Sequence, residues 1–152
     1  LTMAPPHLHN VKPAQVSKLL SACLIDGCRA ATMERSIRGR ELIDVLVPAH
    51  FFPHLSEVER AQETQTLLIN ACSSWGFPRG DAGQIVIGLK DGMFGRSLTD
   101  RREDAGRLLD TSGDRFRRRQ EKSILGDIAF EAIRLAAGLP FAEQQLRLHL
   151  VV

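Results

Sequence analysis

Apolar side chains recur at three- and four-residue intervals along most of this chain, which is the spacing of one helix face. In the stretch 13–31 they are Val16, Leu19, Leu20, Cys23 and Leu24. The segments that follow this pattern are 13–31, 35–47, 56–75, 81–94, 97–109 and 112–137. The sequence therefore predicts an all-α fold, an irregular bundle of about six helices.

Local start and stop signals support these helices. Pro13 suits the first turn of a helix. Ser56, followed three residues later by Glu59, is a capping-box pattern. Further N-cap candidates are Ser97 or Thr99, and Ser112. Proline at both ends of 48–53 predicts irregular structure between the second and third helices.

Three segments are less well determined. The β-branched residues of 84–89 are compatible with a strand, but we favour a helix because no partner strand precedes them. The alternating pattern of 146–150 fits a short strand or a docked extension. Residues 1–12 contain two prolines and no apolar period, so we expect a flexible N-terminal arm. The rest, 13–152, then forms a single helical domain.

Composition limits the function more than it defines it. The net charge is only +2, so binding to nucleic acid requires clustered cations rather than bulk charge. No apolar run is long enough to span a bilayer, and the N-terminus has no secretory-signal pattern. Both observations favour a cytoplasmic protein without a membrane partner.

The cysteines do not form a disulfide pattern. They are three in number, Cys23, Cys28 and Cys72, and their spacing is not repeated. On a continuous helix Cys23 and Cys28 would point roughly 140° apart. We therefore expect all three to be small buried residues.

Other candidate chemistry is weak. His50 and His54 have a metal-ligand spacing, but Pro53 lies between them and no further ligand set is evident. The glycines of 88–95 lack the lysine and the spacing of phosphate-binding loops. No nucleophile motif is present. We predict no metal, no cofactor and no enzymatic activity.

The stretch 98–137 carries the clearest pattern. It predicts a helix, a four-residue turn at 110–113 and a long basic helix, which are the parts of a helix-turn-helix unit. Ala105 and Gly106 supply small residues where the two helices cross, and Leu109 can pack on Phe116 across the turn.

This stretch resembles a known class of segment. The residues that carry the resemblance are Leu98 to Arg102, Ala105, Gly106, Leu109, Ser112, Phe116 to Arg119 and Glu121. They are similar to helix-turn-helix segments of poorly characterised actinobacterial regulatory proteins. The resemblance implies a DNA-binding or regulatory module without catalytic residues. The chain departs from the usual pattern at Asp110, where the turn often has glycine, and at Arg119, where an apolar residue is commoner.

These observations define the expected site. With Phe116 buried, one long helix would present a row of cations to the major groove of double-stranded DNA. The predicted contacts are Arg115, Arg118 and Lys122 in the row, Arg119 beside it, and Arg101 and Arg102 on the DNA backbone. We therefore predict a non-enzymatic DNA-binding transcriptional regulator, with its N-terminal helices available for dimerisation.

The alternative is a helical protein-interaction module that does not bind nucleic acid. The stretch 96–122 holds nine basic and six acidic residues, so its excess charge is modest. Asp114 can pair with Arg118, and Arg117 with Glu121, across one helical turn. An apolar loop at 51–52 would then contact a protein partner.

Overall fold

The computed structural model describes residues 6–139, and within this range the chain is entirely helical, without strands. Its elements are the 3₁₀ turn η1 (Pro6–Leu8), α1 (Pro13–Cys23), α2 (Ala30–Glu34), α3 (Ile37–Leu46), α4 (Glu57–Trp75), α5 (Arg79–Val86), α6 (Leu98–Leu108), α7 (Gly113–Arg119) and α8 (Glu121–Ala136). The bundle is confirmed, but the described chain has eight α-helices rather than about six. The difference arises because two of the predicted helices are each divided.

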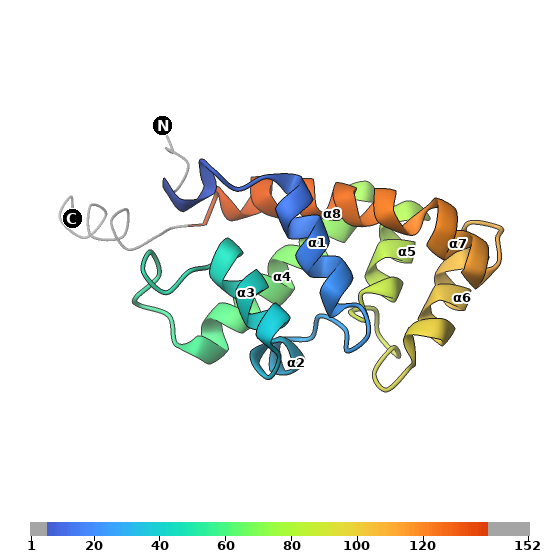
Figure 1. Cartoon of the computed structure of the whole chain (residues 1–152), viewed down its shortest axis with the longest axis horizontal. Helices are drawn as coiled ribbons and strands as arrows, with labels where there is room; N and C mark the ends of the chain where they lie inside the picture. The colour runs from blue at the N-terminus through green and yellow to red at the C-terminus, as the bar shows by residue number, and fades with distance from the viewer. Residues whose placement is uncertain (1–5, 140–152) are drawn as a thin grey trace.

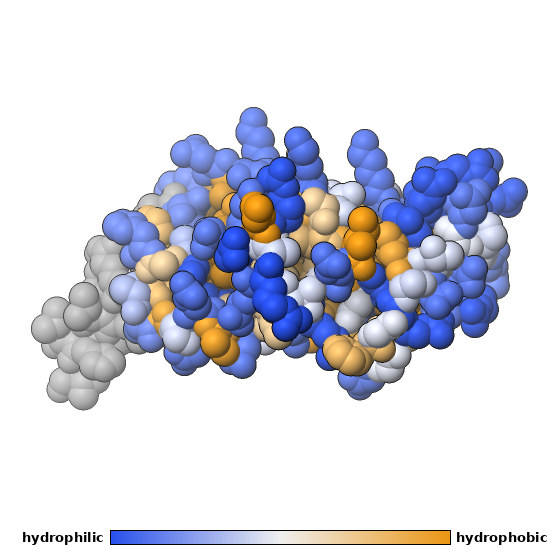
Figure 2. Space-filling view, turned by 60° about the horizontal axis from the view of Figure 1, so that its bottom comes forward, coloured by the Kyte–Doolittle hydropathy of each residue, from blue (hydrophilic) through white to orange (hydrophobic). Residues whose placement is uncertain are grey.

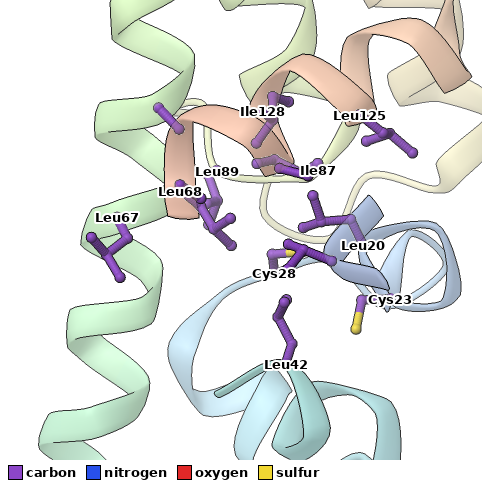
Figure 3. Close-up of a cluster of buried hydrophobic side chains, with 14 of the residues drawn as sticks. Leu20, Cys23, Cys28, Leu42, Leu67, Leu68, Ile87, Leu89, Leu125 and Ile128 are labelled. Atoms are coloured by element: carbon purple, nitrogen blue, oxygen red, sulfur yellow. The ribbon is translucent and has the colours of Figure 1, made fainter. Parts of the chain in front are cut away.

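Helix α8 runs along the long axis of the molecule and holds the bundle together (Figure 1). It packs against α1, α4 and α5, while α6 and α7 lie at one end of the long axis. The core between these helices is aliphatic (Figure 3). Its fully buried members include Leu20, Leu42, Leu68, Ile87 and Ile128. The spacing that predicted the helices therefore also selected most of the core.

The first predicted helix ends early. Gly27 has a φ of 86°, a left-handed conformation that glycine adopts without strain, and its N–H donates to the Cys23 carbonyl at 2.8 Å. This turn ends α1, and the chain starts again at α2. Cys28 and Cys23 are thereby brought together, although a continuous helix would have kept them on different faces.

The long helix predicted for 112–137 is also divided, at Gln120, whose φ of −122° leaves the helical range. Residues 118–122 include neither proline nor glycine, so nothing local indicates the break. Phe116 and Glu121 are both buried, at 0% and 7% exposure. They would lie roughly 140° apart on a straight helix, and the change of direction allows both to face inward.

The capping signals and the ends of several helices are confirmed. The capping box of Ser56 and Glu59 opens α4. Ser97 and Ser112 each accept a backbone N–H at the start of α6 and α7. The uncertain stretch 84–89 is helical to Val86 and then turns.

The loop at 51–52 is not the apolar surface that the alternative function needed. Phe52 is 1% exposed, and Phe51 packs partly buried against the core. Both rings lie within 6 Å of the His7 ring, centroid to centroid. Of the predicted arm 1–12, residues 6–12 are described, and Leu8 is buried there. The predicted extension 146–150 lies outside the described residues.

Candidate nucleic-acid interface

The connection between α6 and α7 is a tight turn. Asp110, with a φ of 56°, is the single non-glycine residue at positive φ in residues 6–139. Aspartate is among the few side chains that enter this region at modest cost. The position where the sequence departs from the usual glycine therefore has the backbone conformation that glycine favours.

Two glycines allow the turn to pack on α6. A Cβ added to Gly106 would lie 2.7 Å from the Thr111 carbonyl oxygen. A Cβ added to Gly113 would lie 2.9 Å from the Glu103 nitrogen. The small residue predicted at this crossing is therefore required, although Gly106 meets the turn rather than the body of α7. Phe116 anchors α7 in the core with 0% exposure.

Arg101, predicted to hold the DNA backbone, does something else. Its side chain is fully buried, and the residue is 2% exposed. The guanidinium donates to the carbonyls of Leu24, Ile25 and Val86, and Nε donates to the Arg96 carbonyl. Burial lowers the pKa of this guanidinium. The assignment of Arg101 to DNA is wrong, since no phosphate can reach it.

The reason for this burial is the orientation of two helix ends. The last carbonyls of a helix have no partner within it. Leu24 follows the end of α1, and Val86 ends α5. Because both ends point toward α6, one guanidinium satisfies both and complements the negative ends of both helix dipoles.

Arg102 lies at the surface but is neutralised. Its Nε and Nη2 donate to the two carboxylate oxygens of Glu121 at 2.7 and 3.0 Å. The Arg102 side chain is 23% exposed and that of Glu121 is 9% exposed. This two-point pair joins α6 to the start of α8. It is an inter-helix contact before it is a site for an anion.

Two arginines of α7 share one carboxylate. Arg117 and Arg118 approach Asp114 at 3.0 and 2.8 Å, and all three side chains are at least half exposed. The hydrogen bond from Arg117, together with the charge of Arg118, lowers the pKa of Asp114. The predicted pairing of Asp114 with Arg118 is confirmed. Arg117 bonds to Asp114, and its predicted pairing with Glu121 is wrong because Glu121 binds Arg102.

Three predicted contacts carry unpaired charge. Arg115, Arg119 and Lys122 are exposed, and their side chains make no hydrogen bond or ion pair with the described part of the chain. Arg115 and Arg119 are one turn apart on α7 and share a face. The surface at this end of the molecule is hydrophilic throughout the view of Figure 2.

Lys122 does not continue the row. It lines a hollow with Lys18 of α1 and Arg117, whereas Arg115 and Arg118 line a shallow depression beside the α6–α7 turn. The break at Gln120 causes this separation. Arg107, which the sequence analysis did not select, lines the same depression as Arg115. Its place in the last turn of the first helix, before a short turn, was the signal that could have found it.

The fold and the charged end define a helical bundle that carries an arginine-rich α6–turn–α7 unit. The chain matches no model of a protein family, no curated protein and no solved structure at a significant level. Residues 6–139 contain no helix long and apolar enough to cross a membrane. In the same range no group of three or more His, Cys, Asp or Glu side chains is placed to hold a metal ion.

Proposed function

We propose that the α6–turn–α7 end of this protein binds double-stranded DNA, as a non-enzymatic regulator of the helix-turn-helix kind. The observation that carries the proposal is the pair Arg115 and Arg119. They lie one turn apart on an exposed helix, and neither guanidinium has a partner. Phosphate oxygens are the natural partners of such guanidiniums.

The paired arginines do not oppose this proposal. An exposed ion pair contributes at most about 1 kcal/mol, so Arg117 and Arg118 can exchange Asp114 for a phosphate at little cost. The stretch 113–122 contains five basic and two acidic residues. Its local excess of positive charge is larger, for its length, than that of the whole chain.

The proposed contact surface differs from the one expected from sequence. It consists of Arg107, Arg115, Arg118 and Arg119, with Arg101 removed and Arg102 held by Glu121. Lys122 stands apart from it on the side of α1. A short basic helix with this set is suited to backbone contacts, which position a protein without reading the base sequence. Helix-turn-helix regulators commonly bind as dimers, so we include a homodimer in the proposal.

The test is fluorescence anisotropy of a labelled duplex, titrated with the protein at several salt concentrations. We expect affinity to fall with salt, since phosphate contacts release counterions. The double variant Arg115→Ala/Arg119→Ala should reduce the slope of log K against log salt by about 2, or about 0.9 per lost contact.

The matched control is Arg35→Ala/Arg38→Ala, which removes the same charge at the α2–α3 side of the molecule. Both arginines are exposed, and these helices lie away from α7 (Figure 1). The control should leave the slope unchanged. If both double variants weaken binding equally, attraction depends on net charge alone, and the proposed surface is refuted.

A protein-interaction module is the second candidate, favoured by a different observation. Phe77, Phe94 and Phe130 are 74%, 78% and 56% exposed, and none belongs to α6 or α7. Exposed aromatic rings are common in protein interfaces. Absence of duplex binding even at low salt would favour this candidate over DNA.

A further inference from the structure

Cys23 and Cys28 are brought together by the turn that ends α1. Gly27 is the left-handed residue of this turn, and its N–H donates to the Cys23 carbonyl at 2.8 Å. In such a turn the residue after the glycine contacts the residue whose carbonyl accepts that bond. Here those residues are Cys28 and Cys23, and both are free thiols.

The two thiols have different surroundings. Cys28 is 0% exposed and lies among the aliphatic side chains of the core, while Cys23 is 5% exposed at the margin of the cluster (Figure 3). Ile25 and Asp26, in the turn between them, are both exposed. A small opening of this turn therefore gives a solute access to Cys23 first.

The electrostatics of the pair follow the same order. A hydrogen bond from the Cys28 thiol lowers the pKa of Cys23, which favours its thiolate. Burial and the same interaction raise the pKa of Cys28 well above the ordinary value. Cys72 has no such partner, and burial raises its pKa to about 12. The reactive form, the thiolate, is thus favoured at Cys23 among the three cysteines.

We propose that Cys23 and Cys28 form a reversible intramolecular disulfide when the protein meets hydrogen peroxide or a related hydroperoxide. This modification is independent of the proposed DNA binding. The sequence gave no sign of it, because the spacing of the two cysteines excludes contact on a continuous helix.

The reaction has two balanced steps. The Cys23 thiolate attacks one peroxide oxygen, the O–O bond breaks, and hydroxide leaves and becomes water, which gives a sulfenic acid at Cys23. The Cys28 sulfur then attacks the Cys23 sulfur, the S–O bond breaks, and the oxygen leaves as water with the Cys28 proton. Two thiols are oxidised by two electrons, and one peroxide is reduced to two waters.

Mass spectrometry of the folded wild-type protein tests the proposal directly. The protein is reduced, freed of reductant, treated with a slight excess of hydrogen peroxide, alkylated and digested with trypsin. Cleavage after Lys18 and Arg29 leaves both cysteines on the peptide 19–29, and Cys72 on the peptide 61–79. We expect 19–29 to lose two hydrogens and escape alkylation, and a thiol reductant to reverse both changes. The peptide with Cys72 should be alkylated as before.

Two variants complete the experiment. Cys72→Ser should still form the disulfide. In Cys28→Ser the sulfenic acid of Cys23 has no resolving thiol, so a dimedone adduct should accumulate several-fold above wild type. The proposal is overturned if 19–29 keeps two alkylated thiols, if the disulfide forms only after the protein is unfolded in urea, or if it links two chains. The wild-type result alone decides the matter if Cys28→Ser does not fold.

Discussion

Replacing Arg101 with methionine should destabilise the fold much more than the same change at an exposed arginine. The side chain fills a buried site where four carbonyl oxygens accept its hydrogens, two of them near the ends of α1 and α5. Methionine has a similar length but donates no hydrogen bond. The variant therefore leaves these carbonyls buried without donors.

The magnitude follows from the burial. Each buried polar group left unsatisfied costs about 1–3 kcal/mol, while the desolvation of the guanidinium, no longer required, offsets part of the total. We expect a net loss of about 3–5 kcal/mol in the free energy of unfolding. With a urea m-value of about 2 kcal/mol/M, the unfolding midpoint would fall by about 2 M.

Urea unfolding followed by circular dichroism at 222 nm measures this loss. Arg107→Met is the matched control, because Arg107 lies on the same helix with a side chain 72% exposed and pairs only with Asp104. It should change stability by less than about 0.5 kcal/mol. If the two variants unfold within about 1 kcal/mol of each other, the capping role of Arg101 is wrong.

Three further predictions concern single positions. Gly106→Ala should destabilise by about 1–3 kcal/mol, because its methyl would meet the Thr111 carbonyl at 2.7 Å. Gly126→Ala in α8 should stabilise by about 0.5–1 kcal/mol, since a Cβ there meets nothing within 4 Å; urea unfolding compares the two, and equal effects would contradict the packing described. Burial lowers the pKa of His7, so the unfolded chain takes up the proton first as pH falls. Stability from this residue is therefore full above the ordinary histidine pKa of about 6.5 and decreases as pH falls toward the folded value. Thermal melts at pH 8 and pH 5 should show a drop that is smaller in His7→Gln, and an equal drop would exclude His7 as the cause. Asp110→Gly should stabilise by about 1 kcal/mol in the same urea assay, because glycine adopts a φ of 56° without strain, and no gain would contradict strain at this turn.

The α6–α7 unit shows how local and tertiary effects divide the prediction of the site. The caps at Ser97 and Ser112 and the anchor Phe116 depend on neighbours in sequence, and all three could be predicted. Arg115 and Arg119 were expected at the surface and are exposed. The burial of Arg101 could not be predicted, since its partners on α1 and α5 are remote in sequence and arginine is rarely fully buried.

The sequence alone determined the helical class, most helix starts and the apolar faces that form the core. These features depend on spacings of three or four residues and on side chains that bond to backbone one turn away. Tertiary structure decided the rest. It divided the last long helix at Gln120 so that Phe116 and Glu121 could both be buried, and it made Cys23 and Cys28 neighbours. Both outcomes depend on which helices meet in space, which the periodicity of one segment does not encode.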